Sequence, residues 1–336
     1  MQNALSLCGD YAINTASTLK SKNYLYRFFG WLVIWVLLAF FIEKFLMVAF
    51  DFPVFSVSAE INWIFLIQSG IYSFALIMAI ISVVSRPVRS LRDEANTIHK
   101  INAFIIRACF WIVLLTGVAD VAIAFMRVEN FLVLFLKNEL AASLGYSNFV
   151  APYIHFPLLI IGVILATKTR TLGFHWLALL IVLAELLIVI SRFVFSYEQA
   201  LMGDLVRYWY AALFLFSSAY TLYDEGHVRV DLLYTNFSRQ RKGFFNALGC
   251  IFWGASTCLV ILVIGMGSNQ SIVNSPLKVF EVSQAGNIGM FIKYQMAVFI
   301  AIFAGTMLIQ FVSYFLESIA DMRGEPGERN VQPAIQ

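Results

Sequence analysis

Seven charged residues lie inside long apolar stretches of the chain, where a charge is a functional candidate by default. They are Glu43, Lys44, Arg107, Asp120, Glu185, Arg192 and Lys293. The cations near the ends of their stretches can extend to the membrane surface. The three carboxylates lie deeper and could form a proton relay if they converged. We expect instead that each pairs with a neighbouring cation or lies between packed helices.

The histidines and cysteines do not form a recognisable cofactor site. A bis-histidine haem needs two histidines at one membrane depth, whereas His155 and His175 are expected at opposite faces. His99 and His227 are expected outside the membrane core. The four cysteines have no metal or redox spacing and are expected to pack as small apolar residues. We predict no cofactor and no metal.

The elements that position these residues are long apolar segments. Hydrophobic residues make up 60% of the chain and charged residues 13%, against about 25% charged residues in a soluble domain. A transmembrane helix needs roughly 20 largely apolar residues. About eight stretches qualify: 28–49, 62–84, 102–125, 150–167, 172–195, 205–223, 243–266 and 287–315. Because lipid cannot satisfy backbone polar groups, these stretches predict an all-α, polytopic membrane protein.

The basic residues predict the orientation, since Lys and Arg concentrate on the cytoplasmic side. One set of tails and loops contains Lys20, Lys22, Arg27, Arg86, Arg89, Arg92, Lys100, Lys168, Arg170, Arg229, Arg239, Arg241, Lys242, Arg323 and Arg329. The alternate loops contain only Arg127, Lys137, Arg207 and Lys278. Both termini are therefore expected in the cytoplasm.

Two of the basic connections, 86–100 and 228–242, have apolar residues at spacings of three and four. This pattern is typical of amphipathic helices that lie along anionic headgroups. We therefore expect interfacial helices in both places, in contact with membrane lipids.

The eight stretches also suggest a 4+4 arrangement with a degenerate internal repeat. Cys109 and Cys250 are 141 residues apart, and Trp111 and Trp253 are 142 apart. Two four-helix copies would be parallel repeats, although chance matches between apolar sequences are an alternative explanation.

Motifs for catalysis or solute binding are not evident. The sequence has no Walker motif and no nucleophile elbow, so an enzyme is not predicted. No stretch has the paired Gly/Pro interruptions that build transporter sites, and Pro152 lies near the edge of its stretch. We expect continuous helices, which favour a scaffold.

The second half of the chain resembles the small membrane subunit (Q subunit) of tripartite ATP-independent periplasmic (TRAP) transporters. The most specific motif is His227-Val-Arg229-Val-Asp231, which follows a helix ending in Ala-Tyr-Thr-Leu-Tyr-Asp-Glu-Gly. Ser191-Arg192-Phe193-Val194-Phe195 is similar to the Arg-Tyr-aromatic segment of that family, with Phe193 in place of Tyr. Ser275-Pro276, Glu281-Val-Ser283 and Lys293 are similar to its larger members.

This resemblance implies a scaffold subunit without substrate or ion sites of its own. Its partners would be a separate large membrane subunit, which carries the substrate and Na⁺ sites, and a periplasmic solute-binding protein. The transported solutes would be organic acids or similar small molecules, and the location would be the bacterial inner membrane. No nucleic acid is expected as a partner. His227, Arg229 and Asp231 would fix the basic arm at the cytoplasmic interface.

The expected organisation is an N-terminal four-helix region, 1–170, a four-helix small-permease-like domain, 171–320, and a cytoplasmic tail, 321–336. The first region is additional to the four helices of an ordinary Q subunit, and its role is open. Two other functions remain: a membrane subunit of a proton-translocating or respiratory complex, using Asp120 and Glu185, and a self-sufficient small-solute carrier.

Overall fold

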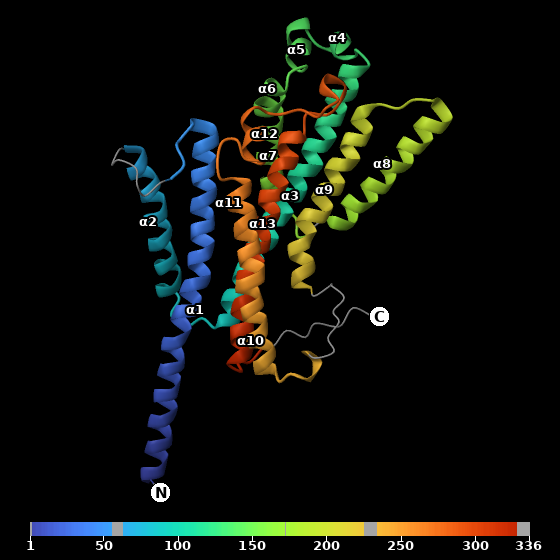
Figure 1. Cartoon of the computed structure of the whole chain (residues 1–336). Coiled ribbons are helices and arrows are strands. Elements are labelled where there is room, and N and C mark those ends of the chain that lie inside the picture. The colour runs from blue at the N-terminus through green and yellow to red at the C-terminus, as the bar shows by residue number, and fades with distance from the viewer. Residues whose placement is uncertain (1, 56–62, 172, 225–233, 328–336) are drawn as a thin grey trace. The chain divides into compact units, whose positions relative to one another are not determined.

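A computed structural model of the chain describes residues 2–55, 63–171, 173–224 and 234–327, with side chains from Asn23 onward and Thr235 excepted. The described residues form helices and connecting loops, with no strand among them. This confirms the all-α prediction. The elements before the middle of the chain are α1 Gln2–Phe50, α2 Trp63–Val84, α3 Leu91–Val128, α4 Leu132–Phe135, α5 Asn138–Ser143, α6 Ser147–Val150, η1 Ala151–His155 and α7 Phe156–Lys168 (Figure 1).

The remaining elements are α8 Phe174–Phe195, α9 Ala200–Tyr223, η2 Tyr234–Asn236, α10 Arg239–Gly249, η3 Cys250–Ala255, α11 Ser256–Gly265, α12 Asn274–Lys278, η4 Gly286–Ile288 and α13 Lys293–Met322. Here η1 and η3 are π-helical turns, and η2 and η4 are 3₁₀ turns.

Seven helical segments of the described chain are long and apolar enough to cross a membrane. They correspond to seven of the eight expected stretches: Asn23–Phe50, Trp63–Val84, Leu91–Val128, Ser147–Lys168, Phe174–Phe195, Arg239–Gly265 and Lys293–Met322. The eighth, expected at 205–223, is the 24-residue helix α9. Its lower hydropathy follows from Asp204, Arg207 and a run of tyrosines and serines, and part of this polar face is buried inside the protein.

The last span begins later than expected, at Lys293 rather than 287. The backbone N–H groups of Met290 and Phe291 bind the carboxylates of Asp204 and Asp120, at 3.1 and 2.7 Å. These bonds anchor the backbone just before Lys293 in a non-helical conformation. Gly289 is extended there, with φ −95° and ψ −177°.

The basic connections also differ from the expected separate interfacial helices. Residues 91–100 are the first turns of α3 and continue without a break into the span. Residues 239–242 begin α10, which belongs to the span Arg239–Gly265. The rest of the second arm includes 228–233, which lie outside the described residues.

Two spans contain π-helical turns, so the expectation of continuous regular helices needs correction. One turn, η1, lies between α6 and α7 and contains Pro152, with Pro157 just after it. The other, η3, joins α10 to α11. Proline lacks the N–H that an α-helix requires, and π-turns inside helices are frequent at functional sites.

By contact density the chain divides into two compact units. Unit 1 comprises Met1–His99, Val228–Ala255 and Ile309–Gln332, and unit 2 comprises Lys100–His227, Ser256–Leu308 and Pro333–Gln336. Each unit thus combines residues from both sides of the border expected at 170. The border at 170 marks where the resemblance to the Q subunit begins and does not separate the compact units. The 4+4 organisation stays a prediction.

Unit 1 contains a helical hairpin, α1 with α2. A buried ion pair joins α1 to the start of α3: Arg27 donates to Glu94 at 2.6 Å, and Trp31 donates to the same carboxylate at 3.1 Å. Asp321 of α13 accepts hydrogen bonds from both Arg92 and Arg239. The beginnings of α3 and α10 are therefore tied to the end of α13.

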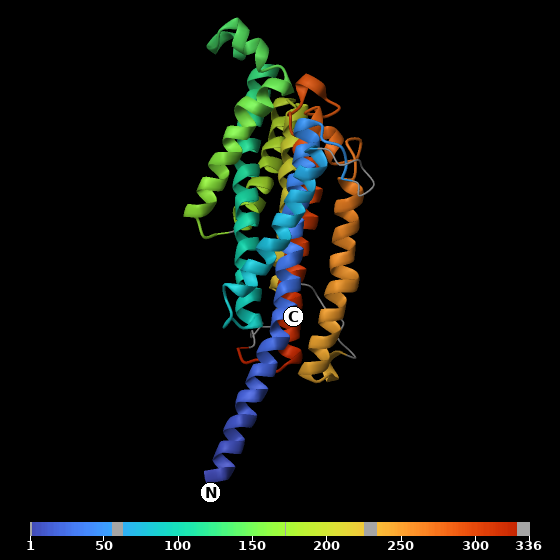
Figure 2. The same cartoon turned by 90° about the vertical axis from the view of Figure 1, so that its left-hand side faces the viewer.

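Unit 2 has a buried cluster between α3, α8, α9 and α13, with Phe110, Tyr208, Phe216 and Phe299 among its members. Gly117 permits close approach of α3 and α9, because a Cβ there would lie 2.5 Å from the indole nitrogen of Trp209. Beyond the end of α3, the short helices α4 and α5 form the outermost part of this unit (Figures 1 and 2).

Candidate functional site

A buried polar network in unit 2 is centred on Asp120 of α3. One carboxylate oxygen lies 3.2 Å from Nε2 of His155, and the other accepts the backbone N–H of Phe291 at 2.7 Å. Asp120 is 0% exposed and His155 2% exposed. A buried carboxylate must be hydrogen-bonded or paired, and here both oxygens have partners.

The network continues from the other side of the imidazole. Nδ1 of His155 lies 2.7 Å from the hydroxyl of Tyr294 and 2.9 Å from Nε2 of Gln295, both on α13. The amide oxygen of Gln295 accepts from Tyr208 of α9. The hydroxyl of Tyr208 lies 2.7 Å from that of Thr116, again on α3. Three helices and η1 are thus linked by one chain of hydrogen bonds.

Arg127, near the end of α3, positions the loop that supplies the Phe291 N–H. Its guanidinium donates to the carbonyls of Asn287 at 2.7 Å and Gly289 at 2.6 Å, and its Cζ lies 4.1 Å from the centre of the Phe291 ring. These contacts hold the 287–291 loop against α3.

Chemically, a carboxylate, an imidazole and a phenol in this order can share and move protons. With Nε2 carrying its proton toward Asp120, Nδ1 accepts from Tyr294 or Gln295. The same bonds also fix the rotamers of helices packed around them. The arrangement therefore supports either a proton-holding centre or a structural lock.

The structure does not bring the three predicted carboxylates together with one another. Glu43 is buried in unit 1, where it pairs with Lys44 at 3.0 Å and accepts a hydrogen bond from Tyr72. Glu185 is exposed at the middle of α8. No hydrogen bond or ion pair reaches its carboxylate from any described residue.

The predicted cations have local partners. Arg192 lies 3.3 Å from Glu198 at the exposed end of α8, and Lys293 forms an ion pair with Glu281. Arg107 donates to the carbonyls of Ala166 and Thr169 at the end of α7, where cations are favoured. The motif residues His227, Arg229 and Asp231 lie outside the described residues.

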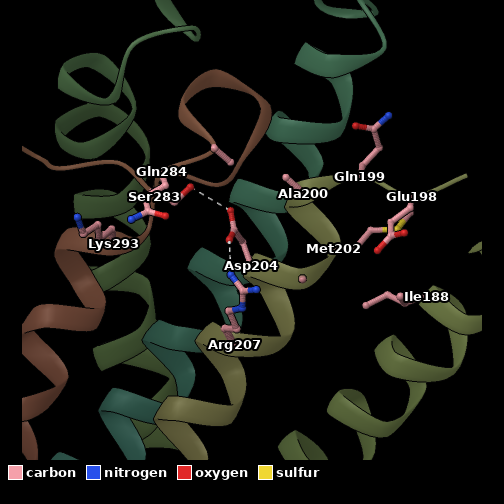
Figure 3. A pocket seen from close by; sticks show the side chains of 12 residues that line it. Ile188, Glu198, Gln199, Ala200, Met202, Asp204, Arg207, Ser283, Gln284 and Lys293 are labelled. Atoms are coloured by element: carbon pink, nitrogen blue, oxygen red, sulfur yellow. Dashed lines mark hydrogen bonds and ion pairs between the residues drawn. The ribbon is translucent and has the colours of Figure 1, made fainter.

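A cavity of about 480 Å³ lies where α8 and α9 meet the loop before α13 (Figure 3). Its lining residues are Ile188, Glu198, Gln199, Ala200, Met202, Gly203, Asp204, Arg207, Ser283, Gln284, Ala285 and Lys293. Asp204 is held by Ser283 Oγ at 3.2 Å as well as by the Met290 N–H. Arg207 is 3.8 Å from Asp204, and its side chain is 77% exposed.

Tyr197 fixes the non-helical link 196–199 that borders this cavity. Its hydroxyl donates to Glu129 at 2.6 Å. Partial burial, together with this bond, raises the pKa of Tyr197 to about 12. The phenol is therefore protonated at physiological pH and remains a donor to Glu129.

Comparison with protein families gives a match over residues 179–321, to the tripartite ATP-independent periplasmic transporters, DctQ component. These residues are similar to the DctQ component. Comparisons with curated proteins and with solved structures give no match. The DctQ component is a membrane part of a transporter and not an enzyme, in agreement with the resemblance drawn from the sequence motifs.

The DctQ region includes most of α8 and all of α9 to α12, together with α13 up to Asp321. It supplies Tyr208, Phe291 and Tyr294 to the buried network, whereas Asp120 and His155 come from the preceding extension. The extension is therefore part of the same core.

Sequence reasoning missed His155, Tyr208, Tyr294 and Gln295 as partners of Asp120. The available signal was the pair Pro152 and Pro157 flanking a histidine, which marks an irregular turn in an apolar helix. The partners on α9 and α13 had no local signal, since they lie 88 or more residues from Asp120 in sequence.

Proposed function

We propose that the chain is the small membrane subunit of a TRAP-type secondary transporter in the bacterial inner membrane. It holds a separate large membrane subunit, which imports organic acids or similar small solutes with Na⁺. A periplasmic solute-binding protein delivers the solute. The excess of Lys and Arg on one set of loops supports an orientation with both termini in the cytoplasm.

The observation that carries this proposal is the surface of α8. Only 6% of its apolar span is buried within the protein. Its exposed residues include Val182, Leu183, Leu186 and Leu187, with Glu185 among them. A carboxylate at the centre of a span costs roughly 3 kcal/mol in lipid. A partner helix that offers a cation or a hydrogen-bond donor would remove this cost.

A pulldown tests the proposal. Tagged full-length chain, extracted from its native host in mild detergent, is expected to recover a larger polytopic membrane protein. The Glu185→Leu variant should recover severalfold less of it, because the partner's polar group would then face leucine. The matched control is Glu139→Gln in α5, an exposed carboxylate outside the DctQ region, which should leave recovery unchanged.

Transport by this chain alone would contradict the proposal. If liposomes containing only the purified chain accumulate organic acids, or if deletion of the chain leaves uptake in the host unchanged, the scaffold role fails. If wild type and Glu185→Leu recover equal amounts of the large protein, Glu185 on α8 does not form the docking surface.

The proton-translocating alternative gains one specific observation, the chain from Asp120 through His155 to Tyr294. It no longer includes Glu185, which lies exposed on α8. Proton uptake by the purified complex in liposomes decides this alternative. Loss of proton uptake in a folded Asp120→Asn complex would favour it over the scaffold.

A further inference from the structure

The cavity at the end of α8 arises because one helix face loses its cover. On α8 the residues facing the core follow helical spacing: Leu177 is buried, while Ile181 and Ala184 are partly buried against the core of unit 2. Ile188 continues the same face but lines the cavity. Figure 1 shows the carboxyl end of α8 leaning away from α9, with the non-helical link 196–199 between them.

The cavity therefore has an apolar side within the membrane. Ile188 is seven residues from the end of α8 at Phe195, which corresponds to a depth of about 10 Å at 1.5 Å per residue. Met202 of α9 lies near it, on the side of the cavity away from Lys293 (Figure 3). Leu187 and Ile190, next along α8, are exposed to the surroundings. An apolar chain lying on this side would be continuous with lipid.

Charged residues of both signs also line the cavity. The cations Arg207 and Lys293 and the anion Asp204 lie on the side away from Ile188, whereas the anion Glu198 lies beside Met202 (Figure 3). The carboxylate of Asp204 is already engaged by Ser283 and by a backbone N–H. At 3.8 Å from Asp204, the guanidinium of Arg207 is beyond hydrogen-bonding distance. Its donors are free to bind a phosphate in bidentate geometry.

We propose that this cavity binds the headgroup of a zwitterionic aminophospholipid, phosphatidylethanolamine. Its phosphate lies on Arg207 and its ammonium on the carboxylate of Glu198, which is 56% exposed and can accept a further donor besides Arg192 at 3.3 Å. One acyl chain follows Ile188 down α8. The balanced charges of the lining oppose an anionic lipid, and the quaternary ammonium of phosphatidylcholine cannot donate a hydrogen bond to Glu198. The volume is in the range of small-ligand sites, roughly 300–1,000 Å³.

This inference uses only the membrane location of the chain and does not depend on the transporter role. It is tested on the full-length chain, purified in detergent and mixed with equal amounts of phosphatidylethanolamine, phosphatidylcholine and phosphatidylglycerol. Native mass spectrometry then counts the lipid retained. We expect the chain to retain one phosphatidylethanolamine in preference to the other lipids. The affinity for this lipid should fall about tenfold in Arg207→Gln, which is the effect of losing one charge-assisted hydrogen bond.

A second variant tests the cavity without removing a charge. A Cβ at Gly203 would meet no atom within 4 Å, although this residue lines the cavity. Gly203→Leu therefore fills the space while keeping α9 folded, and it should abolish the preference. Gly70→Leu in α2 is the matched control, because a Cβ there also meets no atom within 4 Å. It should bind as wild type does.

Four results would overturn the proposal. The first is equal retention of the three lipids by wild type, and the second is unchanged retention in Gly203→Leu. The third is displacement of the lipid by soluble glycerophosphoethanolamine at equal concentration, which would make the site one for a soluble solute. A photoreactive residue at Gln199 should capture lipid in cells, and capture of a protein alone would also refute the lipid assignment.

Discussion

Asp120 and Glu185 both lie in apolar helices, but the first carboxylate is enclosed by donors and the second has no partner among the described residues. This difference assigns the two carboxylates different roles. Asp120 stabilises the folded chain through groups on four elements. Glu185 makes no hydrogen bond or ion pair with the described residues, and under the proposed function it faces the partner subunit.

We expect the Asp120→Asn variant to lower the free energy of unfolding by about 1–3 kcal/mol, because it weakens a buried charge-assisted bond. His155→Phe should cost a similar amount. The double variant should cost less than the sum, with a coupling of roughly 0.5–3 kcal/mol for residues in one network. Unfolding of the purified chain in detergent measures all three, and additive losses would show that the two side chains act independently.

Glu185→Gln is the control for the same measurement. An exposed side chain away from structural features changes stability by about 0.5 kcal/mol or less. A loss comparable to that of Asp120→Asn would mean that Glu185 has a structural partner within the chain.

At the scale of elements, the start of α8 depends on one glycine. Gly173, the residue before α8, has φ +78°. A Cβ at this position would lie 2.2 Å from the ring of Phe110 in α3. Left-handed backbone costs an L-residue about 1–2 kcal/mol, and the aromatic ring must also move.

Gly173→Ala is therefore expected to lower the free energy of unfolding by about 2 kcal/mol or more, from backbone strain and crowding together. Gly70→Ala in α2 should have the opposite sign and stabilise by up to about 1 kcal/mol, since alanine favours helix and the space is open. Thermal unfolding of both variants gives the comparison. A neutral Gly173→Ala would show that α8 can shift away from Phe110.

The sequence predicts elements better than their ends, and types of site residue better than their partners. Long apolar runs give the helices directly, because lipid leaves no other backbone structure. The start of α13 could not be predicted, since it depends on Asp120 and Asp204 binding distant N–H groups. Glu43 beside Lys44 is a local pair and could be expected. The residues of the Asp120 network come from η1, α9 and α13, which are distant in sequence, and could not be predicted.

At the scale of the whole molecule, the two compact units do not follow the order of the chain. Unit 1 joins the first 99 residues to all of α10 and η3 and to the last part of α13, and unit 2 joins most of α3 to α9 and the first part of α13. The extension and the DctQ region therefore complete each other's cores, although the family match covers the second alone.

We expect that residues 171–336 do not accumulate as a folded protein when expressed alone. Co-expression of 1–170 as a separate chain should restore them, because a break near Arg170 falls in a loop between α7 and α8. Membrane fractionation and size-exclusion profiles report the outcome. A stable, monodisperse 171–336 fragment would show that the DctQ region folds by itself.

The π-helical turn at Ala151–His155 has a consequence for how this helix changes in evolution. A π-turn holds one residue more than the α-turn it replaces, so the faces before and after it are out of phase by about 100°. Losing that residue would restore a regular helix and rotate Val150, which is 0% exposed in a second buried cluster, out of its place. A single-residue gap here in a homologous chain thus records a change of helical phase, and substitutions around residues 123–150 should accompany it.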